Sequence, residues 1–217
     1  ARLVIAADGV DSTVCRLAGV AVKSRASTDA AVATVVRTEG APGNTAFQRF
    51  GSQGPLAFLP LGHSLSCTHC SAVIWSQDIA VTESVVALDD SAFINVLQDA
   101  SEGVLGRIHE VDRRFAFLLN DHVVDDFNPF PRLLVIGDAA RAIHPLAGQG
   151  VNLGLEDVAG IIEKSSETSD LGEPEIWRTF AQQRRVRAQT MISSMRFLRG
   201  TYGLANPIGR WLRNVGI

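Results

Sequence analysis

The stretch GDAARAIHPLAGQG, Gly137 to Gly150, decides the fold of this chain. The apolar run 133–136 before it predicts a buried strand over 132–136, and residues 151–164 after it predict a helix. The connection between them is long and contains Pro145. Because ligands bind at the carboxyl ends of strands in open α/β sheets, this loop predicts a ligand site at a sheet edge.

The residue types in the loop suit a flat ligand that carries sugar hydroxyls. Asp138 can only accept hydrogen bonds, which matches a pair of hydroxyl donors. Gly148 and Gly150 let the backbone approach a planar ring, and the following helix begins with free N–H groups. The alternative is an ordinary strand–loop–helix connection in which Asn152 caps the helix. A nicotinamide site is less favoured, because no GxGxxG pattern occurs in the 217 residues.

A second acidic turn lies near the start of the chain, in AADGVDSTVCR (Ala6 to Arg16). The apolar run before it predicts a strand that ends on Asp8-Gly9, and Ser12 or Asp11 would cap the short helix that follows. Alone, an Asp-Gly pair indicates no more than a common turn. The sequence opens inside this strand and without Met, so we expect it to be a fragment of a longer chain.

The gross composition excludes several classes of protein. With 46% hydrophobic residues the chain has enough apolar material for a packed core, and its net charge of −3 argues against nucleic-acid binding. No apolar run is long enough to cross a bilayer. Three cysteines, an odd number, argue against a secreted disulfide scaffold and for a reducing compartment.

The average charge hides an asymmetry between the two ends of the sequence. Residues 176–217 contain eight arginines and no acid, while the remaining 12 of the 20 basic residues and all 23 acids lie before them. The arginines would either lie on a solvated helix face that packs on an acidic body, or form a docking surface for anionic lipid or an acidic partner.

The rest of the chain predicts short strands and a few helices. β-type runs punctuated by Gly, Pro and Asn indicate an antiparallel sheet, and longer runs behind capping residues indicate helices. The predicted strands are 29–39, 45–50, 55–61, 71–76 and 113–119, and the predicted helices are 91–100 behind Asp89 or Asp90, a short continuation to His109, 174–199, and 207–215 after a break at 200–206. The fold class is therefore α/β mixed with α+β, with an antiparallel sheet inserted between two pieces of an α/β layer and a helical end.

The segment HSLSCTHC holds four residues of the types that bind zinc: His63, Cys67, His69 and Cys70. Adjacent residues on an extended strand point to opposite faces, so His69 and Cys70 could hardly share one metal. We expect a β-hairpin with incidental Cys and His and no metal site, with zinc as the alternative. His144 is expected to be a structural hydrogen-bonding residue and not a general base.

Taken together, the two acidic turns resemble motifs of the single-component flavoprotein aromatic hydroxylases. Residues 6–12 resemble the DG motif of that family, and residues 137–152 resemble its GD motif. HPLAGQGVNLGLEDV resembles the branch that hydroxylates polyprenylated rings in ubiquinone biosynthesis, as do QRFGSQGPLAFLPL, VIWS and NPIGRWLRNVGI. The resemblance covers nearly the whole chain.

The resemblance implies where the cofactor FAD would bind. Asp138, next to Gly137, would bind the ribityl chain, and Asp8 and Gly9 would lie near the pyrophosphate and the approach of the pyridine nucleotide. The residues that would line the isoalloxazine ring are Pro145, Gly148, Gly150, Val151 and Asn152. In this family NAD(P)H reduces the flavin, O₂ adds to give a flavin hydroperoxide, and that species hydroxylates a phenol ring.

Three positions differ from the pattern of the resembled family. Arg141 stands where His is usual, Ala6 where Gly is usual, and Cys15 where Arg is usual, with Arg16 following it. The GxGxxG turn that holds the ADP half of FAD is absent from the 217 residues. We therefore expect this fragment alone to bind FAD weakly or not at all, and to be inactive.

The resemblance predicts an FAD-dependent monooxygenase that hydroxylates the aromatic ring of a polyprenyl phenol in ubiquinone biosynthesis. The alternatives are a non-catalytic scaffold or partner subunit with the same fold, and a hydroxylase of a soluble aromatic. The predicted organisation is an FAD-binding part at 1–25 and 121–170, a β-sheet substrate domain at 26–120, and a helical region at 171–217. We expect a cytoplasmic location, or the matrix side of the mitochondrion in a eukaryote. Peripheral membrane contact through the Arg-rich helices and association with other ubiquinone-biosynthesis proteins are further expectations, with no nucleic acid as a partner.

Overall fold

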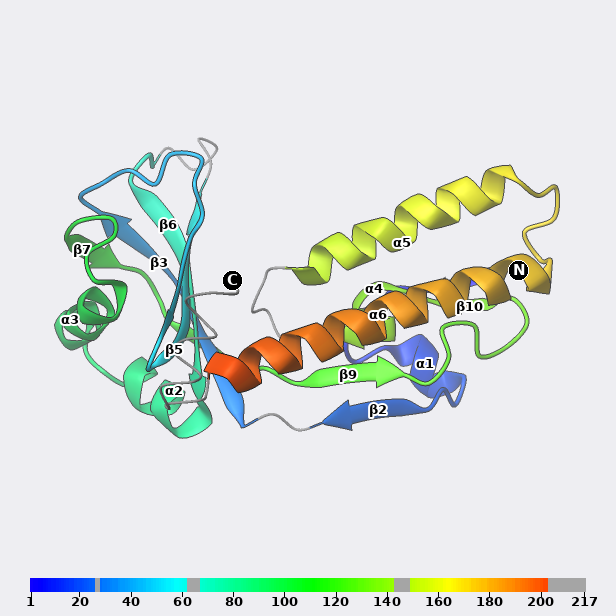
Figure 1. The fold of residues 1–217 in the computed structure, drawn as a ribbon, viewed down its shortest axis with the longest axis horizontal. Coiled ribbons are helices and arrows are strands. Elements are labelled where there is room, and N and C mark those ends of the chain that lie inside the picture. Colours follow the sequence, from blue (N-terminus) through cyan, green and yellow to red (C-terminus); the bar gives the residue numbers. More distant parts are fainter. Residues whose placement is uncertain (26–27, 62–66, 143–148, 203–217) are drawn as a thin grey trace. The chain divides into compact units, whose positions relative to one another are not determined.

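The computed structural model describes residues 1–25, 28–61, 67–142 and 149–202. It divides into two compact units, drawn in Figure 1: unit 1 is Ala1–Ala26 with Asn120–Ile217, and unit 2 is Ser27–Leu119. Unit 2 is therefore a continuous insertion between two parts of unit 1. Several residues of the sequence-based predictions lie outside the described residues, namely His63, His144, Pro145, Gly148 and the helix 207–215.

Unit 2 is an antiparallel sheet with two helices. Its strands are β3 (Asp29–Thr38), β4 (Phe47–Gly51), β5 (Gly54–Pro60), β6 (Cys70–Asp78), β7 (Ile108–Val111) and β8 (Phe115–Leu118), and its helices are α2 (Ile79–Val86) and α3 (Asp90–Ser101). The strand order is β4-β5-β6-β3-β7, and β8 also pairs with β3. This sheet confirms the predicted antiparallel insertion.

One face of the unit 2 sheet forms a hydrophobic core. Trp75 on β6 lies opposite Leu56 on β5 and Val32 on β3, so three neighbouring strands present apolar side chains on the same face. These side chains are buried in one cluster with Phe93 and Leu97 of α3. The packing follows from alternation, because every second side chain of a strand points to the same face.

Unit 1 contains a parallel strand pair, a small antiparallel sheet and two long helices. Its elements are β1 (Val4–Ala6), α1 (Thr13–Leu17), β2 (Val22–Arg25), β9 (Asp121–Val124), β10 (Leu133–Val135), α4 (Gly137–Ala140), β11 (Arg141–Ala142), α5 (Gln149–Ser166) and α6 (Pro174–Tyr202). β1 pairs with β10 in parallel, and the small sheet has the order β11-β9-β2.

The helix α6 covers the parallel strand pair. It begins at Pro174, as predicted, because proline lacks the N–H that the first turn would leave unpaired. Trp177 and Phe180 are buried with Leu134 and Val135 of β10. Figure 1 shows α6 alongside α5, and ion pairs join the two helices. Among the described helices, none is long and apolar enough to cross a membrane.

The arginines of α6 follow in part the first of the two predicted alternatives. Arg184 and Arg187 both form ion pairs with Glu156 of α5, so they pack on an acidic neighbour. Arg178 instead pairs with Glu175 one turn earlier on the same helix.

Some predicted elements differ from the structure. The short helix expected up to His109 is wrong, because the chain turns at Gly103 and Gly106 and then enters β7, which pairs with β3. The helix predicted to end at about Arg199 continues to Tyr202, and the remainder of the break predicted at 200–206 lies outside the described residues. The sequence analysis also missed several short elements, namely β2, α2 and β9.

A disulfide joins Cys67 and Cys70 at the start of β6. The sequence analysis expected these two cysteines to be incidental, and that expectation was wrong. The neighbouring His69 is held by the backbone, because its Nδ1 lies 3.0 Å from the Glu39 carbonyl oxygen and its own carbonyl accepts from the Thr38 N–H. The Cys-x-x-Cys spacing was the available signal, and it was read only as a metal pattern.

We predict that reducing this disulfide costs unit 2 no more than about 2 kcal/mol of unfolding free energy, because the loop that it closes is short. The measurement is urea denaturation followed by circular dichroism, with and without dithiothreitol. The double variant Cys67→Ser/Cys70→Ser should reproduce the reduced protein, while Cys15→Ser should leave the effect of dithiothreitol intact, since Cys15 lies in unit 1. A loss of unfolding free energy well above about 2 kcal/mol on reduction would contradict the prediction.

Candidate functional site

The two acidic turns meet at one edge of the parallel strand pair in unit 1. Ala6, the last residue of β1, lies opposite Val135, the last residue of β10. The pairing continues beyond them, because the Ile136 N–H donates to the Ala6 carbonyl at 2.9 Å. Asp8 and Asp138 follow these paired residues directly, so both acidic turns leave the sheet at its carboxyl edge, where α/β proteins bind ligands.

Asp138 is an exposed carboxylate at this edge. It lies in the first turn of α4, and no hydrogen bond or ion pair engages its side chain among the residues that the structure describes. Gly137 before it has a φ of 57°, in the left-handed region that favours glycine. The Gly137 N–H donates to the Asp157 carboxylate at 3.0 Å. The carboxylate of Asp138 is thus available to a ligand, and the backbone before it is held by the hydrogen bond from Gly137 to Asp157.

The start of α5 lies beside this turn. A Cβ built on Gly154 would be 3.8 Å from the Gly137 Cα, so the helix approaches the strand end closely. Gly150, Val151 and Asn152 lie in the first turn, whose N–H groups have no acceptor within a helix. A Cβ on Gly150 would meet open space, and Val151 is 74% exposed. These residues offer hydrogen-bond donors and room for a planar group.

Asp8 holds the beginning of α1. Its carboxylate accepts from the Ser12 hydroxyl at 2.5 Å and from the N–H groups of Thr13 and Val14 at 2.8 and 3.2 Å. Ser12 is the N-cap, as one of the two predicted alternatives had it, because its Oγ accepts from the Cys15 N–H. The hydrogen bond from Ser12 is the main reason why the pKa of Asp8 is lowered below its usual value of 3.8.

We predict that Ser12→Ala raises the pKa of Asp8 towards 3.8, because the largest stabilisation of the carboxylate is lost. The folded pKa lies below the unfolded one, so this bond adds stability above about pH 3.8 that disappears as the pH falls through the folded pKa. An NMR titration of the Asp8 carboxyl carbon measures the change. Thr13→Ala is the matched control, since Thr13 contacts Asp8 only through its backbone N–H. An unchanged pKa in Ser12→Ala would contradict the prediction.

Two of the positions that differ from the family pattern face the protein core. Cys15 is buried among the apolar residues of unit 1, while Arg16 after it is exposed and contacts Thr13. Arg141 is also buried, and its Nη1 donates to Asp157 at 2.8 Å. The charge of Arg141 is therefore balanced inside the protein. The sequence analysis did not identify Asp157.

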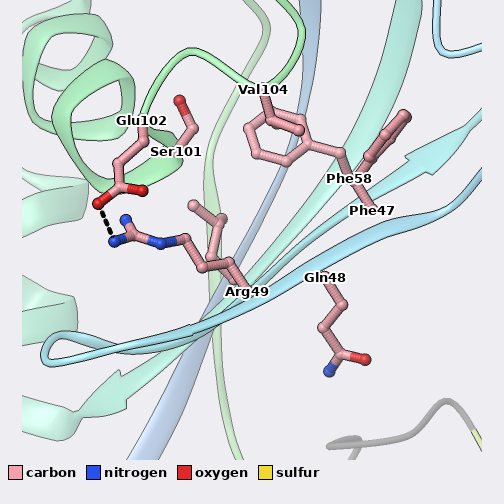
Figure 2. Close-up of a pocket in the computed structure, with 8 residues that line it drawn as sticks. Phe47, Gln48, Arg49, Phe58, Ser101, Glu102 and Val104 are labelled. Atoms are coloured by element: carbon pink, nitrogen blue, oxygen red, sulfur yellow. Dashed lines mark hydrogen bonds and ion pairs between the residues drawn. The ribbon is translucent and has the colours of Figure 1, made fainter. Parts of the chain in front are cut away.

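Unit 2 contains a separate cavity of about 380 Å³, between strand β4 and the end of α3. Figure 2 shows Phe47 and Phe58 on its apolar side and Arg49 pointing to Glu102 on its polar side. Arg49 donates to the Ala100 carbonyl and forms an ion pair with Glu102, so it ties the edge strand to the end of α3. Phe47, Leu56 and Phe58 of this lining belong to the apolar cluster that α3 covers, and neither acidic turn contributes to the lining.

An acceptor carboxylate at the carboxyl edge of parallel strands, beside a helix N-terminus, is an arrangement in which α/β proteins bind ligands such as nucleotide cofactors. Residues 1–195 match the protein-family model of the FAD binding domain. The chain belongs to this family of FAD-binding proteins, which confirms the flavoprotein family and the FAD cofactor predicted from the two acidic turns.

Curated proteins similar to this chain include a ubiquinol hydroxylase and a ubiquinone biosynthesis monooxygenase. The chain is 29% identical over 223 residues to 3-demethoxyubiquinol 3-hydroxylase of Escherichia coli strain K12. It is 28% identical over 255 residues to the mitochondrial ubiquinone biosynthesis monooxygenase COQ6 of Xenopus tropicalis. Both alignments cover 100% of this chain but only 55% and 53% of the relatives, so the chain spans about half their length.

Solved structures share the fold. PqsL from Pseudomonas aeruginosa, a probable FAD-dependent monooxygenase, matches with a TM-score of 0.70 and 21% identity, over 88% of this chain and 54% of that chain. The p-nitrophenol 4-monooxygenase PnpA from Pseudomonas putida DLL-E4 matches with a TM-score of 0.64 and 17% identity, over 96% and 52%. These matches confirm the predicted α/β fold with an inserted antiparallel sheet.

Proposed function

We propose that this protein is an FAD-dependent monooxygenase that hydroxylates the aromatic ring of a polyprenylated phenol in ubiquinone biosynthesis. The main support from the structure is that Asp8 and Asp138 leave the same carboxyl edge of the β1–β10 pair. Membership of the FAD-binding family and the similarity to a ubiquinol hydroxylase and a ubiquinone biosynthesis monooxygenase support the reaction class.

The residues of unit 1 fit the parts of FAD by their chemistry. Asp138 would accept hydrogen bonds from the ribityl hydroxyls, because its carboxylate is exposed and has no partner among the described residues. Gly150, Val151 and Asn152 would present N–H groups to the polar edge of the isoalloxazine ring, near Pro145 and Gly148 in the sequence. When bound and reduced by NAD(P)H, the flavin supplies the activation of O₂.

The turn at Asp8 would face the pyrophosphate and the approach of NAD(P)H mainly through its backbone. The Asp8 carboxylate is already engaged by Ser12, Thr13 and Val14, so its proposed role is to hold the turn in place. Gly9 has a φ of 89°, and a Cβ there would meet nothing within 4 Å, so the backbone is open to a ligand. Three donors would partly offset the negative charge of the Asp8 carboxylate, and the open backbone of the turn would meet the cofactor.

The substrates in this proposal are O₂ and a polyprenyl phenol, with the unit 2 sheet on the substrate side. Association with other ubiquinone-biosynthesis proteins and peripheral membrane contact through α6 are parts of the same proposal. The location would be the cytoplasm, or the mitochondrial matrix side in a eukaryote. Residues 1–25 and 121–170 would then bind FAD. Residues 26–120 would bind the substrate, and residues 171–217 would form the helical region.

The test is the visible absorption spectrum of the protein expressed from its complete coding region. Flavin bands that bleach with NADH or NADPH, together with the gain of one oxygen atom by a short-chain polyprenyl phenol in mass spectrometry, are the expected results. A soluble phenol without the prenyl chain serves as the matched substrate control. A folded protein that stays colourless in excess FAD would favour the non-catalytic scaffold instead.

A further inference from the structure

A fully buried carboxylate connects three elements of unit 1 behind the candidate FAD site. Asp157 of α5 is 0% exposed. Its Oδ2 accepts from the Gly137 N–H at 3.0 Å and from Arg141 Nη1 at 2.8 Å, and its Oδ1 accepts from Arg184 Nε at 2.6 Å. The strand end, the helix α5 and the helix α6 therefore share one hydrogen-bond acceptor.

The surroundings of Asp157 balance its charge. Arg141 is buried on one side, with its guanidinium 5.6 Å from the Phe127 ring centroid. Arg184 lies on the other side and also donates to the Leu153 carbonyl and to Glu156. A buried ion network of this kind adds little net stability over apolar packing, because each charge loses its hydration. The network therefore says less about the stability of unit 1 than about which backbone and side-chain positions are held in place.

That geometry acts on the residue before Asp138. Gly137 adopts a left-handed φ of 57°, and its only side-chain acceptor among the described residues is Asp157. The direction of the following residue depends on this backbone conformation. The bond from Gly137 to Asp157, together with the Ala140 N–H bond to the Ile136 carbonyl, holds the backbone from which the Asp138 side chain leaves.

We propose that Asp157, held by Arg141 and Arg184, is a positioning residue that aims Asp138 at the ribityl hydroxyls of FAD. The inference rests on the proposed function, because it assigns the support of the same cofactor site. Asp157 itself would not touch the cofactor. It orders the turn before FAD binds, so that binding does not have to fix the Gly137 backbone.

The test compares two neighbouring carboxylates of α5 that share Arg184. Asp157→Asn should weaken FAD binding at least about tenfold in a fluorescence titration, because the amide cannot accept from all three donors. Glu156→Gln is the matched control and should stay within about twofold, since Glu156 contacts Arg184 and Arg187 but neither Gly137 nor Arg141. Circular dichroism at the titration temperature verifies that each variant is folded.

Equal FAD dissociation constants for the two folded variants would overturn the inference, because a purely structural network would not distinguish them. Should Asp157→Asn fail to fold, the double variant Arg141→Met/Asp157→Leu replaces the buried pair by apolar side chains, an exchange that buried ion pairs often tolerate. This variant should fold and still lose FAD affinity at least about tenfold, and unchanged affinity would overturn the inference. These titrations use the protein expressed from its complete coding region, and a wild type of that protein that binds no FAD would instead overturn the proposed function, and the inference with it.

Discussion

Replacing Asp138 with alanine is expected to weaken FAD binding by about tenfold or more, while the protein stays folded. A carboxylate that accepts hydrogen bonds from hydroxyls contributes about 1.5–3 kcal/mol, and each 1.4 kcal/mol corresponds to a factor of ten in affinity. The side chain is exposed and makes no contact that holds the described structure together, so the free energy of unfolding should hardly change. Quenching of flavin fluorescence on binding to the protein expressed from its complete coding region gives the dissociation constant.

Two further variants make this measurement specific for the site. Asp138→Asn keeps one carbonyl oxygen at the same place, so it should lose less affinity than Asp138→Ala. Glu163→Ala removes the same charge from an exposed position further along α5 and should leave FAD affinity unchanged. If Glu163→Ala weakened binding as much as Asp138→Ala, the effect would be one of net charge and the assignment of Asp138 to the ribityl chain would fail.

Replacing Trp177 with alanine is expected to destabilise unit 1 by about 3–5 kcal/mol. The indole is 0% exposed, its Nε1 donates to the Leu171 carbonyl at 2.8 Å, and its ring meets Phe180 edge-on at 6.2 Å. The variant leaves a cavity under α6 and an unpaired carbonyl. Because domains unfold at a cost of only about 5–15 kcal/mol, this loss brings unit 1 close to unfolding. Urea denaturation followed by circular dichroism measures it.

Trp177→Phe separates the two contributions. It keeps an aromatic ring against Phe180 but removes the hydrogen bond to Leu171, so it should cost about 1 kcal/mol for the bond, plus the smaller volume lost. A urea midpoint of Trp177→Ala equal to that of the wild type would show that α6 does not depend on this contact.

The elements that the sequence predicted well carry their own local signals. β3 alternates or runs apolar over its whole length, and Asp89 begins α3 by accepting from the Ala92 N–H, which is a capping pattern visible in the sequence. β10 is a short apolar run followed by glycine and aspartate, and this change, with the glycines of the following loop, was the signal for a site at its end.

The elements that were missed depend on partners distant in sequence. Residues 22–25, VKSR, show no apolar pattern and become β2 only because β9 pairs with them. The predicted helix up to His109 failed for the same reason, since pairing with β3 draws β7 into the sheet. Nothing in the sequence of the helix around Asp157 marks this residue as functional. The fold alone brings Gly137 and Arg184 to its two carboxylate oxygens.

The parallel pairing of β1 with β10 also sets the order in which the molecule can assemble. All residues of unit 2 lie between these two strands in the chain, and its sheet pairs only strands within that interval. On a ribosome, unit 2 has all its strands before β10 emerges, whereas β1 must wait for it. Pairing over such a long sequence separation is slow unless the intervening chain is already compact. We therefore expect the unit 2 sheet to fold first and to shorten the loop that the β1–β10 pair has to close.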